Sequence, residues 1–397
     1  MISRIIDFSI RRRWFVVLAT LALCVLGTWA LARIPIDAVP DITNNQVQIN
    51  TIAQALSPVE IEKQVTFRIE TALAGTPGLE YTRSLSRNGF SQVTAVFSDR
   101  TNIYFARQQI NERLLEIRST LPPGAEPRIG PVATGLGEIY MWVVEYAPHP
   151  GAKARDAEPG WQSDGAYLSP EGQRLRSALE RAAYLRTVQD WIIRPQLKGV
   201  PGVAGVDAIG GYVKQYHVKP DPSKLIALGL SFGDIARAIE ANNLSRGATT
   251  IEQNGEGYVV RATGRVETAA DIADIAVATR ASVPIRVKDI AEVSIGAQIR
   301  TGSGSEQGEE VVVGTALMLI GANSRTVAAA VDAKIDEIRR TLPPDVTLKT
   351  VLNRTQLVDA TIATVATNLA EGALLVIAVL FALLGNFRAA VITAVVI

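Results

Sequence analysis

The stretch WFVVLATLALCVLGTWALA, residues 14–32, decides what kind of protein this chain is. Its nineteen consecutive residues carry no charge, and Arg11, Arg12 and Arg13 precede it directly. As an α-helix, a segment of this length measures roughly 28 Å, close to the thickness of a bilayer's hydrocarbon core. Basic residues favour the cytoplasmic side of a membrane helix. We therefore predict a transmembrane helix, with residues 1–13 as a cytoplasmic N-terminus.

The same stretch has some features of a cleaved signal peptide. A basic segment comes first, and Ala30-Leu31-Ala32 resembles a small-residue cleavage site. The apolar run is longer than the usual signal core of about 7–15 residues, and Trp29 suits an interfacial anchor. We favour an uncleaved helix at residues 14–34, because a second apolar segment follows near the C-terminus.

That second segment, residues 356–385, predicts another transmembrane helix. Its apolar core at residues 372–384 is thirteen residues long, and residues 357–369 extend it with a single charge. Arg388 follows in a short turn, which places this end on the cytoplasmic side as well. Residues 389–397 begin a third apolar segment, which we interpret as a truncated third transmembrane helix. The region between the first two helices then lies on the far side of the membrane.

Composition excludes several classes of protein. Forty Lys and Arg residues nearly balance thirty-nine Asp and Glu residues, and no basic patch interleaved with aromatics suggests nucleic-acid binding. The single cysteine, Cys24, lies in the first apolar stretch, so the region between the helices has neither disulfide nor thiolate metal site. The sequence contains no P-loop, H-E-x-x-H, C-x-x-C or G-x-S-x-G motif. We therefore predict no enzyme and no bound cofactor.

Between the helices, the chain first shows the element order of a ferredoxin-like unit. Val47, Ile49 and Thr51 alternate with polar residues, which predicts a strand. Ser57-Pro58-Val59-Glu60 is typical of a helix N-terminus, and this helix should run to about residue 74. Two strands, a helix and a last strand follow at residues 79–85, 92–97, 101–120 and 128–132. The order βαββαβ is that of the split βαβ unit.

Two short motifs then recur in the same order. Gly-x-Pro-Gly at residues 75–78 returns 124 residues later, and EIRSTLPP at residues 116–123 returns as EIRRTLPP 221 residues later. The two offsets differ by 97 residues, so a second copy of the unit carries about 97 extra residues between its two helices. We place this insertion in the central hairpin of the second copy, at residues 212–308.

The second copy also has recognisable elements. Its predicted strands and long helix lie at residues 138–145, 175–198, 203–209 and 311–320. Residues 147–173 are rich in glycine, proline and charge, and we expect them to form a surface excursion. The insertion has elements of its own at residues 216–219, 232–243, 258–262, 269–275 and 284–288.

The region between the helices is rich in carboxylates, but most of them should simply be solvated, and few residues stand out as candidate metal ligands. Asp37 and Asp41 stand at the predicted membrane exit, where a solvated role explains them as well as cation binding does. Glu371 should lie near the outer end of the second helix, as an interfacial or a functional carboxylate. The other ligand types are isolated from one another and suit packing or surface roles: Met141, Met318, His149 and His217.

Five segments of the chain are similar to one transporter family. They read PIDAVPDITNNQVQI, TRSLSRNGFSQV, TGLGEIY, VPGVAGVDAIGGYVKQYHV and GALLVIAVLFALLGNFRAA. Together they resemble the resistance-nodulation-division (RND) heavy-metal efflux pumps, most of all the cobalt-zinc-cadmium type. The resemblance covers essentially the whole chain, and family members are more than twice as long.

The resemblance implies an α+β membrane protein: transmembrane helices plus a periplasmic loop of two ferredoxin-like βαββαβ units with an inserted docking subdomain. Residues 35–135 would be the first porter subdomain. Residues 136–211 together with 309–355 would be the second, and residues 212–308 the docking subdomain. The chain would lie in the bacterial inner membrane with most of its residues in the periplasm.

The resemblance also implies a function and partners. A homotrimer embedded in the lipid bilayer would export divalent cations such as zinc, cobalt, cadmium or nickel. It would use the proton motive force and work with a periplasmic adaptor and an outer-membrane channel. In the family, the proton relay belongs to the fourth transmembrane helix and the metal ligands lie mostly in a second periplasmic loop, so none is transferred to this chain. Arg83 matches a charged residue that lines the porter cleft; the alternative is a surface arginine at a strand end.

Two other interpretations stay open. The first is a membrane-anchored periplasmic binding or adaptor module without transport activity, although such a module would not need a third apolar segment. The second is a copper- or silver-exporting member of the same family. Cu(I) and Ag(I) prefer thiolate and thioether ligands, and the region between the helices offers only Met141 and Met318. We therefore favour divalent cations.

Overall fold

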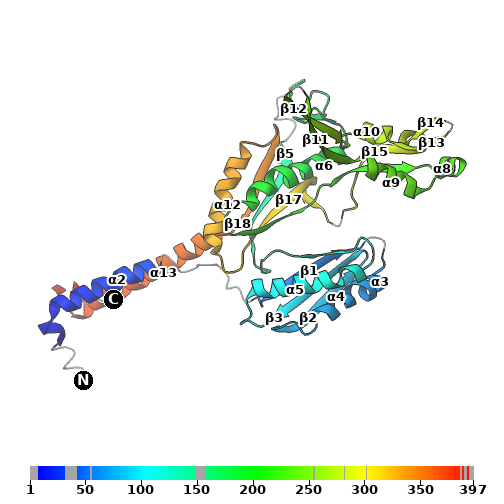
Figure 1. Ribbon diagram of the computed structural model, residues 1–397. Helices are drawn as coiled ribbons and strands as arrows, with labels where there is room; N and C mark the ends of the chain where they lie inside the picture. Colours follow the sequence, from blue (N-terminus) through cyan, green and yellow to red (C-terminus); the bar gives the residue numbers. More distant parts are fainter. Residues whose placement is uncertain are drawn as a thin grey trace.

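The computed structural model describes residues 8–31, 43–53, 56–147, 157–253, 255–280, 282–300, 302–384, 387–388 and 391–392. In Figure 1, two α/β bodies and a smaller projecting part lie at one end, and two long helices extend from them in one direction. The predictions for Asp37, Asp41 and His149 fall outside the described residues, as does most of the third apolar segment.

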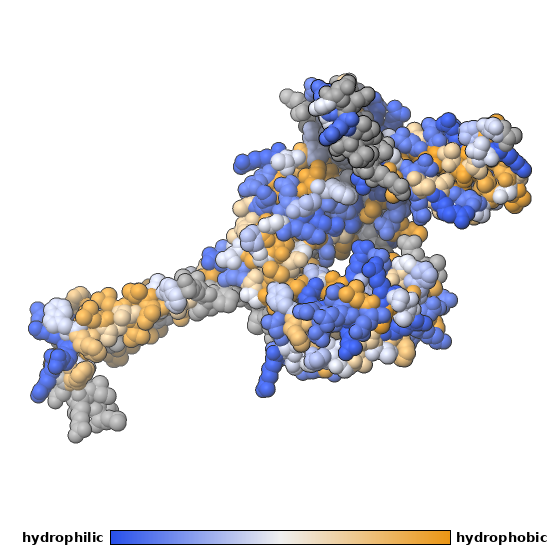
Figure 2. All heavy atoms as spheres, viewed as in Figure 1, coloured by the Kyte–Doolittle hydropathy of each residue, from blue (hydrophilic) through white to orange (hydrophobic). Residues whose placement is uncertain are grey.

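The two long helices are α2 (Arg13–Leu31) and α13 (Arg354–Leu384). Both are long and apolar enough to cross a membrane, and their apolar windows are not buried inside the protein. Figure 2 shows apolar residues on the surface of this extension. Exposed apolar surface of this extent is unfavourable in water and favourable in lipid. The structure therefore has apolar helices where the sequence predicts them.

The first α/β body follows the predicted order of elements. The chain runs through β1 (Gln46–Ile52), the helix α3–η1–α4, β2 (Leu79–Arg87), β3 (Phe90–Phe97), α5 (Ile103–Ile117), the short 3-10 turn η2 (Arg118–Thr120) and β4 (Glu126–Ile129). The helix is made of α3 (Pro58–Ile61), the π-helical η1 (Glu62–Thr66) and α4 (Phe67–Leu73). The sheet order is β2-β3-β1-β4, with every pair antiparallel. The last strand begins two residues earlier than predicted.

One face of this sheet is covered by the two helices. Val47, Ile49 and Thr51 of β1 are buried, whereas the residues between them are not. Ile61 and Ile69 of the helix are fully buried against the same face. Burying each such side chain contributes about 1.5–3 kcal/mol, so the period-two strand and the helix stabilise each other. The opposite face carries Gln48 and Arg83, which are exposed, and Thr94 and Val96 of β3, which are buried.

The second body repeats this arrangement. Its elements are β5 (Glu138–Tyr146), α6 (Ala178–Val188), η4 (Gln189–Ile193), α7 (Arg194–Lys198), β9 (Val203–Ile209), β17 (Glu309–Met318), α12 (Ser324–Arg339) and β18 (Val346–Asn353). Here β17 pairs with β9 on one side and with β5 on the other, and β5 pairs with β18. Four of the five strands of this sheet, in the order β9-β17-β5-β18, match β2-β3-β1-β4, and the fifth, β16 (Gly304–Glu306), pairs with the start of β17.

The repeat extends to the caps of the helices. Ser57 and Glu60 form a capping box at the start of α3, and Ser177 and Glu180 form one at the start of α6. An asparagine, Asn102 in the first copy, caps the second helix of each unit. Both first helices also contain one π-helical turn, at η1 and η4. The two bodies therefore share local chemistry as well as strand order.

The repeated Gly-x-Pro-Gly motif has a structural reason in both copies. Gly78 and Gly202, its last residues, have φ values of +79° and +88°. A β-carbon at Gly78 would stand 2.3 Å from the Thr101 hydroxyl, and one at Gly202 would stand 2.5 Å from a methyl of Val327. Only glycine fits there, because each turn lies directly against the N-terminal end of the second helix of its unit, α5 or α12.

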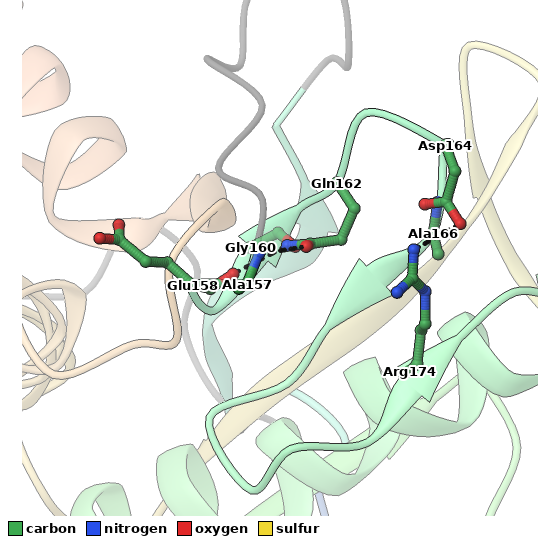
Figure 3. A network of polar contacts seen from close by, with 7 residues as sticks. All are labelled: Ala157, Glu158, Gly160, Gln162, Asp164, Ala166 and Arg174. Carbon is green, nitrogen blue, oxygen red and sulfur yellow. Dashed lines mark hydrogen bonds and ion pairs between the residues drawn. The ribbon is translucent and has the colours of Figure 1, made fainter.

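The prediction of a surface excursion at residues 147–173 was wrong for residues 157–173. Two strands of this segment, β6 (Gly160–Trp161) and β7 (Tyr167–Leu168), form a three-stranded sheet with β8 (Arg174–Leu175), which follows it directly. Figure 3 shows how its turns are closed. The Gln162 amide donates to the carbonyls of Glu158 and Gly160, and Asp164 pairs with Arg174 at 2.6 Å.

Aromatic side chains hold this small sheet to the second body. Trp161 and Tyr167 are buried and contact Tyr146 of β5, with ring centroids 5.3 and 4.8 Å away. The Tyr167 hydroxyl donates to the carbonyl of Pro344 at 2.7 Å. Polar composition suggested solvent exposure, but two aromatic residues in the segment are enough to anchor it to the core.

The insertion in the second body has its own hydrophobic core. Leu225, Ile235, Val287 and Ile290 are buried together. The sequence predicts part of its structure but misses several short elements. The elements are β10 (Lys214–Pro220), α8 (Pro222–Leu228), α9 (Phe232–Asn242), β11 (Leu244–Gln253), β12 (Glu256–Gly264), α10 (Ala269–Asp274), β13 (Ala276–Arg280), β14 (Val283–Arg286), α11 (Val287–Ile290), β15 (Ala291–Ala297) and β16 (Gly304–Glu306). Of these, α8, β11, β13, α11, β15 and β16 have no counterpart among the predicted elements.

Candidate functional site

The uncovered face of the first sheet carries Arg83, the one site residue that the sequence suggests. We call this surface the open face. It lies opposite the helices, and the strand register places the side chains of β1, β2 and β3 in rows across it. Its central residues are Gln46, Gln48, Asn50, Arg83, Leu85, Gln92 and Thr94. Arg83 is in the middle of β2, an edge strand, and not at a strand end.

Side-chain hydrogen bonds connect the strands of the open face. The Arg83 guanidinium donates to the Gln46 amide oxygen at 2.8 Å. The Gln92 amide donates to the Asn50 amide oxygen at 3.0 Å. These contacts orient the polar groups along the sheet, but both lie where water has access. Arg83 and Gln48 are exposed on the open face, whereas Thr94 and Val96 of the central strand β3 are buried on it.

A groove of about 670 Å³ lies at one end of the open face. Ile52, Phe90 and Pro123 give it an apolar part, and Glu126 and Arg128 give it charge. The Glu126 carboxylate pairs with Arg118 at 3.4 Å and with Arg128 at 3.6 Å. The two guanidinium groups thus neutralise the negative charge of the Glu126 carboxylate, which lines the groove. The groove therefore has no excess negative charge.

The described residues do not assemble a metal site. No group of three or more His, Cys, Asp or Glu side chains lies together within the part of the chain that the structure describes. The open face offers amides, hydroxyls and guanidinium groups, which bind anions, carboxylates and water better than they bind divalent cations. Arg83 therefore has the chemistry to orient or repel charge, but not to coordinate a metal ion.

The other candidates that the structure describes do not come together. Met318 is buried and Met141 is half-buried, both in the sheet of the second body. His217 lies on β10 of the insertion, and its ring stands against the backbone of Gly296. Glu371 is exposed on α13. These positions agree with packing and surface roles for the thioethers and the histidine.

The structure brings together one charged cluster that the sequence does not reveal. Lys349 of β18 contacts Glu306, and Glu145 of β5 lies near both. Burial, and then repulsion from Glu306, raises the pKa of the Glu145 carboxyl. The hydrogen bond to Glu306 raises the pKa of the Lys349 ammonium. More than 150 residues separate Glu145 from Glu306 in the sequence, so no local pattern could have paired them.

Comparison with known proteins identifies the family. A sequence profile of the AcrB/AcrD/AcrF family matches residues 5–397. The nickel and cobalt resistance protein CnrA of Cupriavidus metallidurans is 56% identical over 100% of this chain and 37% of its own length. The cobalt-zinc-cadmium resistance protein CzcA of the same organism is 50% identical over 100% of this chain and 35% of its own length. The cation efflux system protein CusA of Escherichia coli is 34% identical over 99% of this chain and 35% of its own length.

Solved structures agree with these relatives. The X-ray crystal structure of a heavy metal efflux pump superposes with a TM-score of 0.81 and 30% identity, over 98% of this chain and 36% of that chain. The chain thus spans little more than a third of the length of the proteins it matches. Because the family profile and these relatives cover nearly every residue, the chain belongs to the AcrB/AcrD/AcrF family, among the RND heavy-metal efflux pumps.

Proposed function

We propose that this chain is part of an inner-membrane RND transporter that exports divalent heavy-metal cations. The observation that carries the metal class is the difference in identity between relatives. The chain is 56% identical to a nickel and cobalt resistance protein and 50% identical to a cobalt-zinc-cadmium resistance protein. It is 34% identical to CusA. A thioether-poor periplasmic region also disfavours soft monovalent copper and silver as substrates.

The same proposal assigns roles to the parts of the fold. Each α/β body has a βαββαβ order and an antiparallel sheet, which supports two ferredoxin-like porter subdomains in the periplasm. The insertion has a separate core and projects from the second body (Figure 1), which supports a docking role toward a periplasmic adaptor and an outer-membrane channel. The working unit would be a homotrimer driven by the proton motive force, with the metal ligands and the proton relay outside this chain.

Arg83 would act on the transport path by charge. Its guanidinium is exposed and donates to the Gln46 amide oxygen, and the strand register places Thr94 beside it. A fixed positive charge repels a cation and attracts a carboxylate across a cleft within about one Debye length. Arg83 would therefore position an acidic partner surface or direct cations away from the sheet.

Metal resistance in cells tests the proposed substrate class. The full-length gene is expressed in a metal-sensitive host, and growth is measured against nickel, cobalt, zinc, cadmium, copper and silver. We expect protection against one or more of the first four metals. Protection against copper and silver alone would exclude the divalent assignment. A host with the empty vector and a host with CzcA are the two controls.

Two arginine variants test the role of the open face. Arg83→Gln removes the fixed charge and keeps a hydrogen-bonding group, and we expect it to lower resistance without changing the amount of protein in the membrane. Arg87→Gln is the matched control, since Arg87 lies on the same strand but stacks on Phe90 at the hairpin end. Equal resistance in the wild type and Arg83→Gln would show that Arg83 is only a surface residue.

A further inference from the structure

The insertion is attached to the second body through two neighbouring segments. The chain leaves β9 at Gly210 and Gly211, and it returns through β16 into β17. Where the two segments pass each other, the amide of Gln298 donates to the carbonyl of Val213 at 2.9 Å. Figure 1 shows the insertion projecting away from the second body. Two segments at one place fix where a projecting domain is attached, but the backbone of consecutive glycines can rotate, so other contacts must set its orientation.

On the outgoing side, Arg186 of α6 holds the backbone. Its guanidinium donates to the Gly210 carbonyl at 3.0 Å and to the Asp190 carboxylate at 2.8 Å. Arg194 pairs with the other oxygen of the same carboxylate at 3.1 Å. The side chains of Arg186, Asp190 and Arg194 are only 18%, 17% and 27% exposed. Charge-assisted hydrogen bonds are stronger than neutral ones, and salt screens partly buried charges less. The Asp190 carboxylate therefore orients the Arg186 guanidinium toward the outgoing segment.

On the returning side, Arg300 contacts both the insertion and the second body. Its guanidinium lies over the ring of Tyr212, 4.6 Å from the centroid, in the geometry of a cation–π contact. The same guanidinium pairs with the Glu310 carboxylate of β17. Tyr212 is the residue after the two glycines, so Arg300 joins the returning segment to the outgoing one, and both to β17.

The first α/β body shows the same place without an insertion. Ser86 is the counterpart of Gly210, since each stands eight residues after the last glycine of its Gly-x-Pro-Gly motif. In the first body, the hydroxyl of Thr66 in η1 lies 2.8 Å from the hydroxyls of Ser86 and Ser91. These neutral groups hold a hairpin that turns directly from β2 into β3. The guanidinium of Arg186 takes their place in the copy whose hairpin carries the insertion, which favours a role toward the insertion.

We propose that Arg186 and Arg300 are positioning residues that fix the orientation of the insertion relative to α6 and β17. The covalent connection and the Gln298 hydrogen bond fix where the insertion is attached, whereas the two guanidinium groups resist its tilting at that point. A displacement of α6 then carries the insertion with it instead of being absorbed at the glycines. The use of this coupling rests on the proposed function, in which the insertion is the docking subdomain and must keep its orientation toward its partners.

Distances between two spin labels test this orientation without any transport measurement. The labels are attached at Ser223→Cys in the insertion and Ala333→Cys on α12, both exposed positions, in a Cys24→Ala background. The full chain is mixed with an excess of unlabelled chain and placed in lipid nanodiscs, so that distances within one chain dominate. For the double variant Arg186→Met/Arg300→Met, we expect the distance distribution to broaden and its maximum to shift. An unchanged distribution in the folded double variant would overturn the proposal.

The matched control removes one guanidinium from the same helix and one from the insertion. Arg181 lies on α6 and donates to the carbonyl of Arg176 at 2.8 Å, just before its own helix. Arg237 lies on α9 of the insertion and pairs with Asp234 of that helix. We expect Arg181→Met/Arg237→Met to keep the wild-type distance distribution, because each of these contacts lies within one part of the molecule. Equal broadening in the two double variants would indicate a general loss of stability and would refute the positioning role.

Hydrogen exchange at the attachment reports on the same contacts and on folding. The Gln298 amide bonds across the two segments, and we expect it to exchange roughly tenfold faster or more in Arg186→Met/Arg300→Met. Wild-type exchange of this amide would contradict the proposal. Protection in β5 and β17 shows whether each variant is folded. If the methionine variant does not fold, Arg186→Lys/Arg300→Lys replaces it in the distance measurement, because an ammonium lacks the planar fork that reaches two partners at once.

Metal efflux by the full-length protein separates this role from the proposed function. We expect Arg186→Met/Arg300→Met to lower efflux and the control variant to retain it. A broadened distance distribution with normal efflux would refute the link between the orientation of the insertion and transport. Absence of divalent efflux in the wild type would instead refute the proposed function, while the distance measurement would still decide the role of the two arginines.

Discussion

The indole of Trp142 lies directly on the backbone of Gly314. A β-carbon at Gly314 would stand 2.2 Å from Cε2 of this indole. Trp142 is fully buried on β5, and its Nε1 donates to the side-chain oxygen of Gln189 in η4 at 2.8 Å. The largest side chain of the second core therefore fits only because the neighbouring strand lacks a side chain at this position.

This relationship predicts that Gly314→Ala destabilises the second body. The methyl group would overlap the indole, and Trp142 cannot turn away without losing Gln189. We expect a loss of about 1–3 kcal/mol, the usual cost of overpacking a core. Chemical denaturation of the chain in detergent, followed by tryptophan fluorescence, measures it. Gly135→Ala is the control, since nothing lies within 4 Å of a β-carbon there; equal effects of the two changes would refute the packing argument.

The charged cluster on β5 predicts a pH effect of defined sign. The pKa of Glu145 is raised in the folded state, so ionisation of this group opposes folding. Its contribution to stability is present below the ordinary value of 4.5 and is lost as the pH rises through the raised pKa. We expect Glu145→Gln to stabilise the chain at pH 7, by less than about 1 kcal/mol because the site is largely hydrated.

Glu180 supplies a control of opposite sign. The backbone amide of Ser177 lowers the pKa of the Glu180 carboxyl, so its contribution is present above the ordinary value of 4.5 and is lost as the pH falls through the lowered pKa. Glu180→Gln should therefore lose stability at pH 7. Melting temperatures of both variants between pH 4 and pH 8, in steps of about half a unit, measure the two slopes. Slopes of the same sign would contradict the assignment.

The topology predicts which positions an impermeant thiol reagent can reach. In a Cys24→Ala background, single cysteines at Ser223 and Gln108 should react in intact cells whose outer membrane has been permeabilised. Both positions are exposed and belong to the region between α2 and α13. A cysteine at Ser9 should stay protected until the cells are lysed, because it precedes α2 on the side that we predict to be cytoplasmic. Protection of the first two positions before lysis would reverse the topology.

The separate core of the insertion predicts that it can be removed. The amide of Gln298 donates to the carbonyl of Val213 at 2.9 Å. The two segments that connect the insertion to the second body therefore lie side by side at this point. Replacing residues 214–297 by a short Gly/Ser linker should keep β16, β17 and the core around Trp142. We expect the cooperative unfolding transition of the remaining protein to persist, as measured by denaturation with fluorescence detection. Loss of this transition would show that the insertion completes the core of the second body.

Local patterns in the sequence determined much of the fold. The uncharged stretch before Arg33 predicted α2, because only length and polarity decide whether a helix suits a bilayer. Ser57 and Glu60 predicted the start of α3, because capping uses residues three apart. The recurrence of Gly-x-Pro-Gly predicted the second copy, because a positive φ against the next helix admits only glycine. Each of these signals is a short motif that determines the structure of the residues in or next to it.

Tertiary structure alone decided the features that join distant residues. Residues 157–173 resemble a surface loop by composition, but Trp161 and Tyr167 reach the core next to Tyr146. Arg83 lies on an open sheet face because β1 and β3 pair in register beside its strand. The contact of Arg354 with Leu136 spans 218 residues. Sequence patterns reflect the local conformational preferences of a residue and its neighbours along the chain. Burial and charge pairing depend instead on which distant segments pack together in the fold.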